Sequence, residues 1–236
     1  MTREHPKTGV SRQHFNRMAE QYDALFVPRL GGYDALHTVI VAMLPEASAQ
    51  PMRVLELGIG TGNLTRKLLE RLPQSQVVGY DLSARMLEQA CAKFASAGTP
   101  VDLVEADIGH ATFPGPFDAI ISAIAVHHVP PRAKPAVFRR LYDALRPGGV
   151  LVIGDTFRAP TPELDATYRQ MRAAEQPHTD GNDAAYEAYR QNAGPAGGSG
   201  TAMPNYLRWM RQAGFTSVDC VWKYFSVAVV YGERPR

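Results

Sequence analysis

Residues 53–65 read Arg53-Val54-Leu55-Glu56-Leu57-Gly58-Ile59-Gly60-Thr61-Gly62-Asn63-Leu64-Thr65. A short apolar run leads directly into a glycine-rich turn and then into a helical pattern. In an open α/β sheet, ligands bind beyond the carboxyl ends of the strands, where glycines let the backbone approach a ligand closely. The stretch therefore predicts a strand, a turn and a helix that together form one wall of a cofactor site.

The turn has the spacing Gly58-x-Gly60-x-Gly62. A dinucleotide fingerprint needs glycine or alanine where this chain has Asn63, so a pyrophosphate cradle is the weaker interpretation. A second strand pattern ends at Asp81, about 20 residues downstream, where a ribose-binding carboxylate is expected. The spacing thus predicts that Asp81 accepts hydrogen bonds from ribose hydroxyl groups.

Two more strand patterns end in polar residues. The run 101–106 leads to Asp107, and the run 117–124 leads to His127 and His128. Because the carboxyl ends of parallel strands meet at one edge of a sheet, we expect these side chains to lie near the glycine-rich turn.

These motifs together resemble the class I S-adenosylmethionine-dependent methyltransferases. The resemblance rests on the glycine-rich turn with Glu56, on Asp81, on Ala106-Asp107, and on the later run Leu145-Arg146-Pro147-Gly148-Gly149-Val150-Leu151. It covers the chain from about Phe15 to the C-terminus. It implies that S-adenosylmethionine is the cofactor and that a small molecule accepts the methyl group on oxygen or nitrogen.

The resemblance also implies the fold: an α/β domain with a seven-stranded, mostly parallel sheet, an antiparallel last strand and helices on both faces. Within this single domain, residues 52–155 form the cofactor-binding core and residues 203–236 the final helix and strand pair. N-terminal helices over 11–45 and an insertion over 160–202 are expected to form a cap. We predict that the insertion is a lid over the acceptor; an inert surface loop is the alternative.

Hydrophobic periodicity predicts the individual elements. Ser11 is the predicted N-cap of the first helix, and a second helix runs from Tyr33 to Leu44. Strands and helices then alternate, which favours a parallel sheet with right-handed crossovers. The elements after the second helix are strand 52–57, helix 62–72, strand 76–81, helix 83–97, strands 101–106 and 117–124, helix 132–146, strand 149–155, helix 203–213, and an antiparallel strand pair at 216–222 and 225–231.

By resemblance, Glu56 organises the polar methionine end of the cofactor and Asp107 accepts from the adenine amino group. Tyr22, in Ala19-Glu20-Gln21-Tyr22-Asp23, is expected to cover the methionine end, with a core residue on a helix face as the alternative. Tyr33 is a similar, weaker candidate. The full set of predicted cofactor-binding residues is Tyr22, Glu56, Gly58, Gly60, Gly62, Asp81, Leu82, Met86, Asp107, Ile108 and Ala123.

Three residues are candidates for work on the acceptor. His127 or His128 could deprotonate an acceptor hydroxyl, because a histidine with a pKa of about 6.5 suits a base at neutral pH. A structural or cofactor-packing role for the pair is the alternative. Asp155, at the end of the strand 149–155, is a candidate for orienting the acceptor. No metal is expected, because no second acid stands near Asp155.

Composition restricts the remaining possibilities. The 236 residues are 45% hydrophobic, with a net charge of +2 and a mean hydropathy of -0.22, which is typical of a soluble globular domain. No apolar run approaches the ~20 residues of a membrane span, and the first 14 residues lack an apolar signal core, so a cytoplasmic location is expected. Scattered basic residues give little support for a nucleic-acid groove. A homodimer through the N-terminal helices is possible.

Two other functions stay open. Gly32-Tyr33, the run 134–142 and the ending 221–228 also resemble carboxy-S-adenosylmethionine synthase, which converts the cofactor itself. Arg190 lies roughly where that enzyme needs an arginine for the new carboxylate, although a solvated helix-face charge is the alternative. The chain could also be a non-catalytic protein that binds S-adenosylmethionine.

Overall fold

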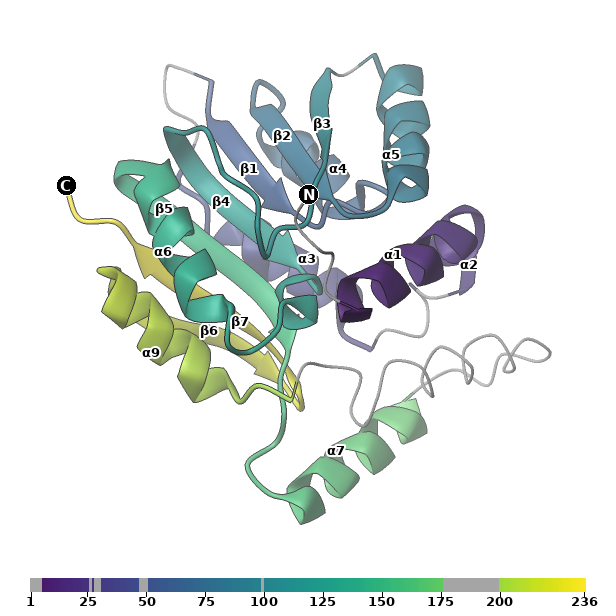
Figure 1. The fold of residues 1–236 in the computed structure, drawn as a ribbon, viewed down its shortest axis with the longest axis vertical. Helices are drawn as coiled ribbons and strands as arrows, with labels where there is room; N and C mark the ends of the chain where they lie inside the picture. The colour runs from purple at the N-terminus through teal and green to yellow at the C-terminus, as the bar shows by residue number, and fades with distance from the viewer. Residues whose placement is uncertain (1–5, 26, 28–30, 47–50, 99, 176–199) are drawn as a thin grey trace.

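A computed structural model describes residues 6–25, 27, 31–46, 51–98, 100–175 and 200–236. Its centre is a seven-stranded sheet with the order β3-β2-β1-β4-β5-β7-β6 (Figure 1). The strands are β1 (Arg53–Leu57), β2 (Gln76–Asp81), β3 (Val101–Glu105), β4 (Phe117–Ala123), β5 (Leu145–Thr156), β6 (Thr216–Tyr224) and β7 (Val227–Glu233).

The strand directions confirm the predicted fold class. β1 pairs in parallel with β2 and β4, β3 with β2, and β5 with β4. β7 is antiparallel to both of its neighbours, β5 and β6, and so runs opposite to the other six strands. In this register Leu57 stands beside Tyr80 on one side and Ser122 on the other, so β1, β2 and β4 end at the same edge.

Helices cover both faces of the sheet (Figure 1). Side chains alternate along a strand, so Val54 packs with α3 and α4 on one face while Leu55 packs with α6 and α9 on the other. The helices are α1 (Pro6–Met18), η1 (Ala19–Gln21), α2 (Tyr22–Leu25), α3 (Tyr33–Ala42), α4 (Asn63–Arg71), α5 (Ala84–Ser96), η3 (Val126–His128), α6 (Lys134–Ala144), α7 (Pro162–Glu175) and α9 (Met203–Ala213), where η marks a 3-10 helix.

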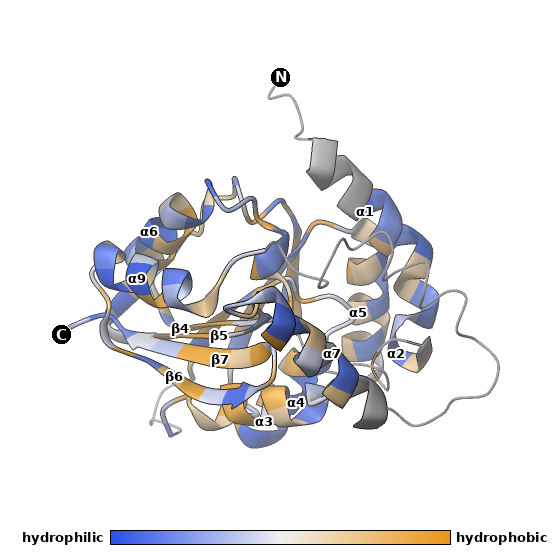
Figure 2. Cartoon of the chain, turned by 90° about the horizontal axis from the view of Figure 1, so that it is seen from below, coloured by the Kyte–Doolittle hydropathy of each residue, from blue (hydrophilic) through white to orange (hydrophobic). Residues whose placement is uncertain are grey.

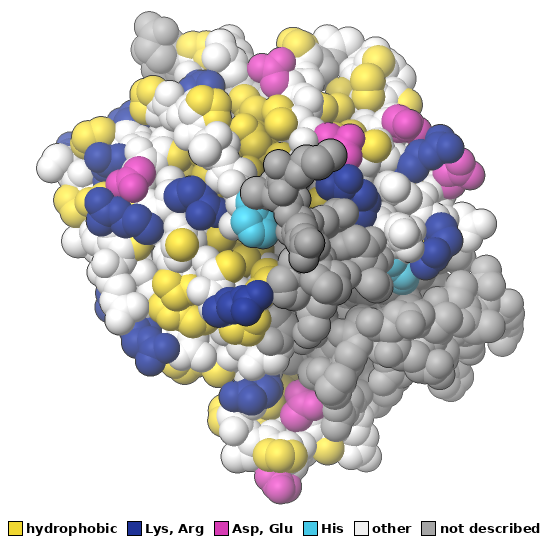
Figure 3. All heavy atoms as spheres, viewed as in Figure 1, with side chains coloured by type: hydrophobic (Ala, Val, Ile, Leu, Met, Phe, Trp, Pro, Cys, Tyr) yellow, Lys and Arg dark blue, Asp and Glu magenta, His cyan; other side chains and the backbone are white. Residues whose placement is uncertain are grey.

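Hydropathy follows this layering. Figure 2 shows hydrophobic residues concentrated along the strands and hydrophilic residues on the outer sides of the helices. On the face drawn in Figure 3, basic and acidic side chains are interspersed instead of gathering in one patch. Within the described part of the chain, the model contains no helix with the length and apolar character that a membrane span requires.

The prediction that Ser11 caps the first helix is wrong. The described part of helix α1 already includes Pro6, five residues earlier, so Ser11 lies inside the helix. The chain then continues through η1 and α2, and we call α1, η1 and α2 together the cap. These helices contact α5.

Two other boundaries differ from the sequence prediction. Residues 147–148, which separate the predicted helix 132–146 from the predicted strand 149–155, lie inside β5, which already begins at Leu145. The N–H of Gly148 donates to the carbonyl of Arg234 at 2.8 Å. The C-terminal hairpin turns at Phe225 and Ser226, not at 223–224. Phe225 has a φ of 50°, a backbone conformation that is uncommon for phenylalanine and could not be predicted from the residue type.

The predicted lid falls partly outside the described residues. Residues 160–175 include α7, which reaches β6 where Nζ of Lys223 donates to the hydroxyl of Tyr168 at 3.1 Å. Residues 176–199, including Arg190, lie outside the described part of the chain. The lid therefore stays a prediction.

Candidate active site

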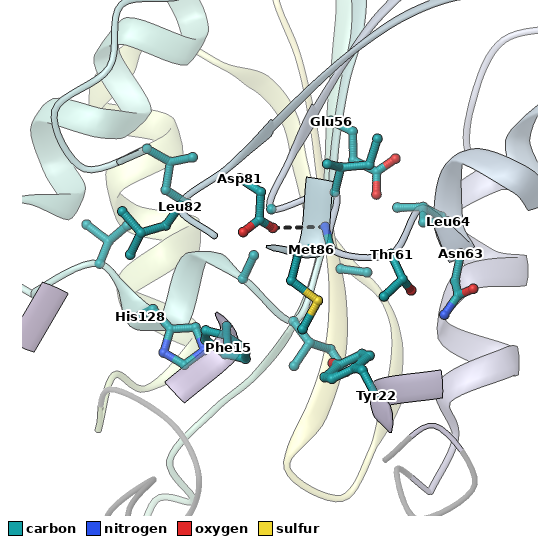
Figure 4. Close-up of a pocket in the computed structure, with 18 of the residues that line it drawn as sticks. Phe15, Tyr22, Glu56, Thr61, Asn63, Leu64, Asp81, Leu82, Met86 and His128 are labelled. Carbon is teal, nitrogen blue, oxygen red and sulfur yellow. Dashed lines mark hydrogen bonds between the residues drawn. The ribbon is translucent and has the colours of Figure 1, made fainter. Parts of the chain in front are cut away.

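A pocket with a cavity volume of about 120 Å³ opens at the carboxyl ends of β1, β2 and β4. Residues from distant parts of the sequence form its wall (Figure 4). Predicted site residues in this wall are Tyr22, Glu56, Gly58, Gly60, Asp81, Leu82, Met86, Asp107, Ile108, Ala123 and His128. Gly62, His127 and Asp155 are absent from the lining among the described residues.

Gly60 and Gly62 of the turn have different surroundings. A Cβ on Gly60 would meet no atom within 4 Å, so this residue borders open space in the pocket. Gly62 has a φ of 84°, and a Cβ there would lie 2.6 Å from the ring of Phe94. Gly62 is thus required for packing between α4 and α5, and Gly60 is the one whose backbone a ligand can approach.

Asp81 stands at the centre of the pocket (Figure 4). Its Oδ2 accepts a hydrogen bond from the backbone N–H of Gly60 at 2.9 Å, and its Oδ1 accepts from the N–H of Ser83 at 2.9 Å. Burial raises the pKa of Asp81, and these hydrogen bonds oppose the shift. The carboxylate is therefore fixed in orientation beside the open backbone of Gly60.

Different residues line the two ends of the pocket. Leu82 and His128 lie toward one end in Figure 4, and Glu56, Leu64 and Asn63 toward the other, with Asp81 between them. Asp107, Ile108 and Met86 also line the pocket. The carboxylate of Asp107 already accepts from the N–H of Gly109 at 2.8 Å and lies 2.9 Å from Nδ1 of His110, so a ligand would share this acceptor.

Glu56 is a buried acid in this wall, with only 1% of its surface exposed. Its Oε2 accepts a hydrogen bond from the hydroxyl of Thr65, a residue of α4. Burial raises the pKa of Glu56 to about 8. A cationic ligand group beside it would restore the charged form, because an opposite charge favours ionisation.

The two adjacent histidines have different hydrogen-bonding surroundings. His128 lines the pocket, whereas Nδ1 of the buried His127 lies 2.6 Å from Oδ1 of Asp155. Their rings pack 4.0 Å apart, and the ring of Phe15 meets His128 edge-on at 5.2 Å. Desolvation by the surrounding protein lowers the pKa of His128 below 6.5, although its side chain keeps exposed surface at the pocket, so the imidazole is neutral at neutral pH. Of the three catalytic candidates, only His128 reaches the pocket.

Sequence reasoning missed several residues of the wall. The clearest is His37 on α3, whose buried Nε2 has no hydrogen-bond partner among the described residues and whose pKa burial lowers to about 4. Its ring packs 4.1 Å from that of Tyr33, one helical turn earlier, so the i, i+4 spacing from Tyr33 could have revealed it. The other missed residues are Phe15, Ile59, Thr61, Asn63, Leu64, Ala106, Ile124, Ala125, Val129 and Pro130.

Ile124 shows local backbone strain at this site. It has a φ of 53°, which is rare for a β-branched residue, and its N–H donates to the carbonyl of Gly154 at 2.8 Å. Strain of this kind clusters at functional sites. It ends β4 at Ala123 and turns the following segment toward η3 and His128.

Comparison with known proteins agrees with this geometry. Residues 54–149 match a family model described as a methyltransferase domain. A demethylmenaquinone methyltransferase of Thermus thermophilus is 33% identical over 188 residues, which cover 78% of this chain and 84% of the relative. The chain belongs to the class I S-adenosylmethionine-dependent methyltransferases. S-adenosylmethionine is accordingly the cofactor of this methyltransferase.

Other relatives cover less of the methyltransferase. A trans-aconitate 2-methyltransferase of Streptomyces coelicolor is 37% identical over 131 residues, 54% of this chain and 43% of the relative. A carboxy-S-adenosyl-L-methionine synthase of Aeromonas hydrophila is 32% identical over 141 residues, 56% of each chain. The chain thus spans about half the length of these two curated relatives.

A solved structure supports the fold of the methyltransferase. The phosphoethanolamine N-methyltransferase 2 of Haemonchus contortus, in complex with phosphomonomethylethanolamine and S-adenosylhomocysteine, aligns with a TM-score of 0.66. The alignment covers 95% of this chain and 60% of that protein at 15% identity. At this level of identity, the likeness concerns the fold alone.

Proposed function

We propose that this methyltransferase transfers a methyl group from S-adenosylmethionine to an oxygen or nitrogen atom of a small-molecule acceptor. The observation that carries the proposal is the position of His128. A neutral imidazole lines the same pocket as Asp81 and the open backbone of Gly60. A side chain that can take a proton is therefore present in the compartment expected to hold the cofactor.

The residues of the pocket fit the cofactor. Gly60 leaves open space that any Cβ would fill, and Asp81 offers a fixed carboxylate for ribose hydroxyl groups. Glu56 is a buried acid suited to an ammonium group, and Leu82, Met86 and Ile108 provide apolar contact for an adenine ring. When bound, S-adenosylmethionine supplies an electrophilic methyl group.

The contribution of the protein is chiefly positional. Holding the acceptor in line with the methyl group, about 3 to 3.5 Å away and shielded from water, can supply several kcal/mol of the barrier. Phe15 and Tyr22 place aromatic surface of the cap on the pocket and exclude water from it. His128 is placed to accept the proton that an acceptor hydroxyl or amine loses at its oxygen or nitrogen.

The class of acceptor is supported by the relatives whose printed names specify small molecules: trans-aconitate and demethylmenaquinone. Carboxy-S-adenosylmethionine synthesis is a second candidate, favoured by the relative of that name. A protein that binds the cofactor without turnover is the third.

Two measurements separate these functions. Protein purified without added ligand is denatured, and the released small molecule is identified by mass spectrometry. S-adenosylmethionine or S-adenosylhomocysteine is expected, whereas carboxy-S-adenosylmethionine would favour the synthase. The protein is then incubated with S-adenosylmethionine and a panel of hydroxy acids, phenols, amines and quinols. Formation of S-adenosylhomocysteine together with a methylated product supports the proposal; formation of neither, despite tight binding, contradicts it.

A further inference from the structure

One acidic side chain of the cap holds the glycine-rich turn. Oδ1 of Asp23, on α2, accepts hydrogen bonds from the hydroxyl of Thr61 at 2.7 Å and from Nδ2 of Asn63 at 2.8 Å. Nζ of Lys93, on α5, donates to Oδ2 of Asp23 at 3.0 Å and to Oδ1 of Asn63 at 2.7 Å. We call these four residues the clasp.

The clasp connects two walls of the pocket. Asp23 directly follows Tyr22, which lines the pocket from the cap side. Thr61 and Asn63 flank Gly62 in the turn and line the pocket from the opposite side. Figure 4 shows Tyr22 near Thr61 across this part of the pocket. The position of Tyr22 is thus tied to the segment that borders the cofactor.

The chemistry of the clasp suits a fixed contact. Burial alone would raise the pKa of Asp23, but hydrogen bonds from Thr61, Lys93 and Asn63 outweigh it and lower the pKa. The carboxylate is therefore ionised at neutral pH, and hydrogen bonds to a charged group are stronger than those between neutral groups. Asp23 also lies at the N-terminus of α4, where a negative charge is favourable.

A second contact fastens the other end of the cap. Oδ1 of Asn16, on α1, accepts a hydrogen bond from the hydroxyl of Ser83 at 2.7 Å. The backbone N–H of Ser83 in turn donates to Asp81. The cap is therefore joined both to the glycine-rich turn and to the segment that carries Asp81. Each contact residue is next in sequence to an aromatic residue of the pocket wall, Asn16 to Phe15 and Asp23 to Tyr22.

We propose that Asp23 is a positioning residue that holds Tyr22 and the cap closed over the cofactor, and that opening of the clasp sets the rate of cofactor release. This inference rests on the cofactor half of the proposed function and not on the acceptor. Asp23 acts through Thr61 and Asn63. Its effect should therefore appear in the kinetics of ligand exchange more than in the folding of the sheet.

The test measures the dissociation rate of S-adenosylhomocysteine from the full chain by stopped-flow displacement. Asp23→Ala removes both carboxylate acceptors of the clasp and should accelerate dissociation about tenfold, the effect of losing a charge-assisted hydrogen bond. Asp23→Asn keeps an acceptor oxygen for Thr61 and should stay within about threefold of the unmodified protein. Glu20→Ala removes an exposed carboxylate from the same cap and should leave the rate unchanged.

Thr61→Val and Lys93→Ala remove hydrogen bonds that the other side chains of the clasp donate to Asp23, and both should also accelerate dissociation. The test therefore does not depend on whether one particular variant folds. Equal rates for Asp23→Ala and Glu20→Ala, with both proteins folded, would overturn the inference. A failure to find the acceptor would leave these rates measurable. If the unmodified protein does not bind S-adenosylhomocysteine, both the clasp and the proposed function are wrong.

Discussion

Nδ1 of His127 lies 2.6 Å from Oδ1 of Asp155, and both side chains are withdrawn from solvent, with 3% and 0% exposed. The other carboxylate oxygen, Oδ2, accepts from the hydroxyl of Tyr206 at 3.0 Å. Burial lowers the pKa of Lys134 to about 8, and the nearby carboxylate of Asp155 opposes part of this shift. Asp155 is therefore the central hydrogen-bond acceptor of a buried polar cluster.

Asp155→Asn should destabilise the fold by about 1 to 3 kcal/mol, the usual cost of leaving a buried polar group without its hydrogen-bond partner. The amide cannot accept at both positions, and Lys134 loses a nearby negative charge. Unfolding in urea measures the effect. The control is Asp143→Asn, whose exposed pair with Arg139 should contribute less than about 1 kcal/mol. Equal stability of the two variants would contradict the prediction.

Glu56 should make the stability of the ligand-free protein fall as pH rises. Its pKa is 4.5 in the unfolded chain and about 8 in the fold, so the folded state binds the extra proton in that interval. Its contribution is complete below pH 4.5 and is lost as pH rises through about 8, a change of about 5 kcal/mol. The difference in unfolding free energy between the unmodified protein and Glu56→Gln, measured at both ends of this interval, isolates it from other titrations. A constant difference would contradict the prediction.

Gly60 and Gly62 should respond differently to alanine. Gly62→Ala places a methyl group 2.6 Å from the ring of Phe94, so a loss of about 2 to 3 kcal/mol in stability is expected. Gly60→Ala meets no such contact and should cost only about 1 kcal/mol of backbone strain, but its methyl group occupies space that the cofactor needs. Thermal unfolding and calorimetric titration with S-adenosylhomocysteine separate the two effects. A Gly60 variant that retains full affinity would show that the ligand lies elsewhere.

His128→Asn should reduce the turnover number about a hundredfold while the affinity for S-adenosylhomocysteine changes by less than about threefold. The reason is that His128 touches the pocket as a neutral base, whereas cofactor contacts come from other residues. Because burial lowers its pKa, activity should show no protonation step of His128 near pH 6.5. Steady-state rates with the identified acceptor across this pH range provide the measurement. An unchanged turnover number would assign His128 to packing alone.

Much of the fold was predictable because local and global signals agree. The strand Gln76–Asp81 and the helix Met203–Ala213 have the predicted bounds, and Ser83 caps α5 as its residue type suggests. The glycine-rich turn and Asp81 meet in the pocket because parallel strands end at one edge. These features depend on periodicity and on turn chemistry, which a single sequence displays.

What the sequence could not show depends on contacts between distant segments. Nothing near Asp23 indicates that it binds residues about 40 positions away, and nothing near His127 and His128 indicates which ring enters the pocket. His37 lies on an ordinary amphipathic helix and reaches the site only because α3 packs beside α4. The hairpin turn at Phe225 lacks glycine, asparagine and aspartate, so no turn signal was present.

Gly58 imposes a rule on how this chain can vary. A Cβ at this position would lie 2.2 Å from the Cβ of Ala125, which places the turn after β1 in contact with the segment after β4. A larger side chain at either position would push the two loops apart and widen the pocket between them. Natural or laboratory variants that enlarge residue 125 should therefore need compensating changes around 58–60, so the two loops are expected to diverge together in homologous sequences.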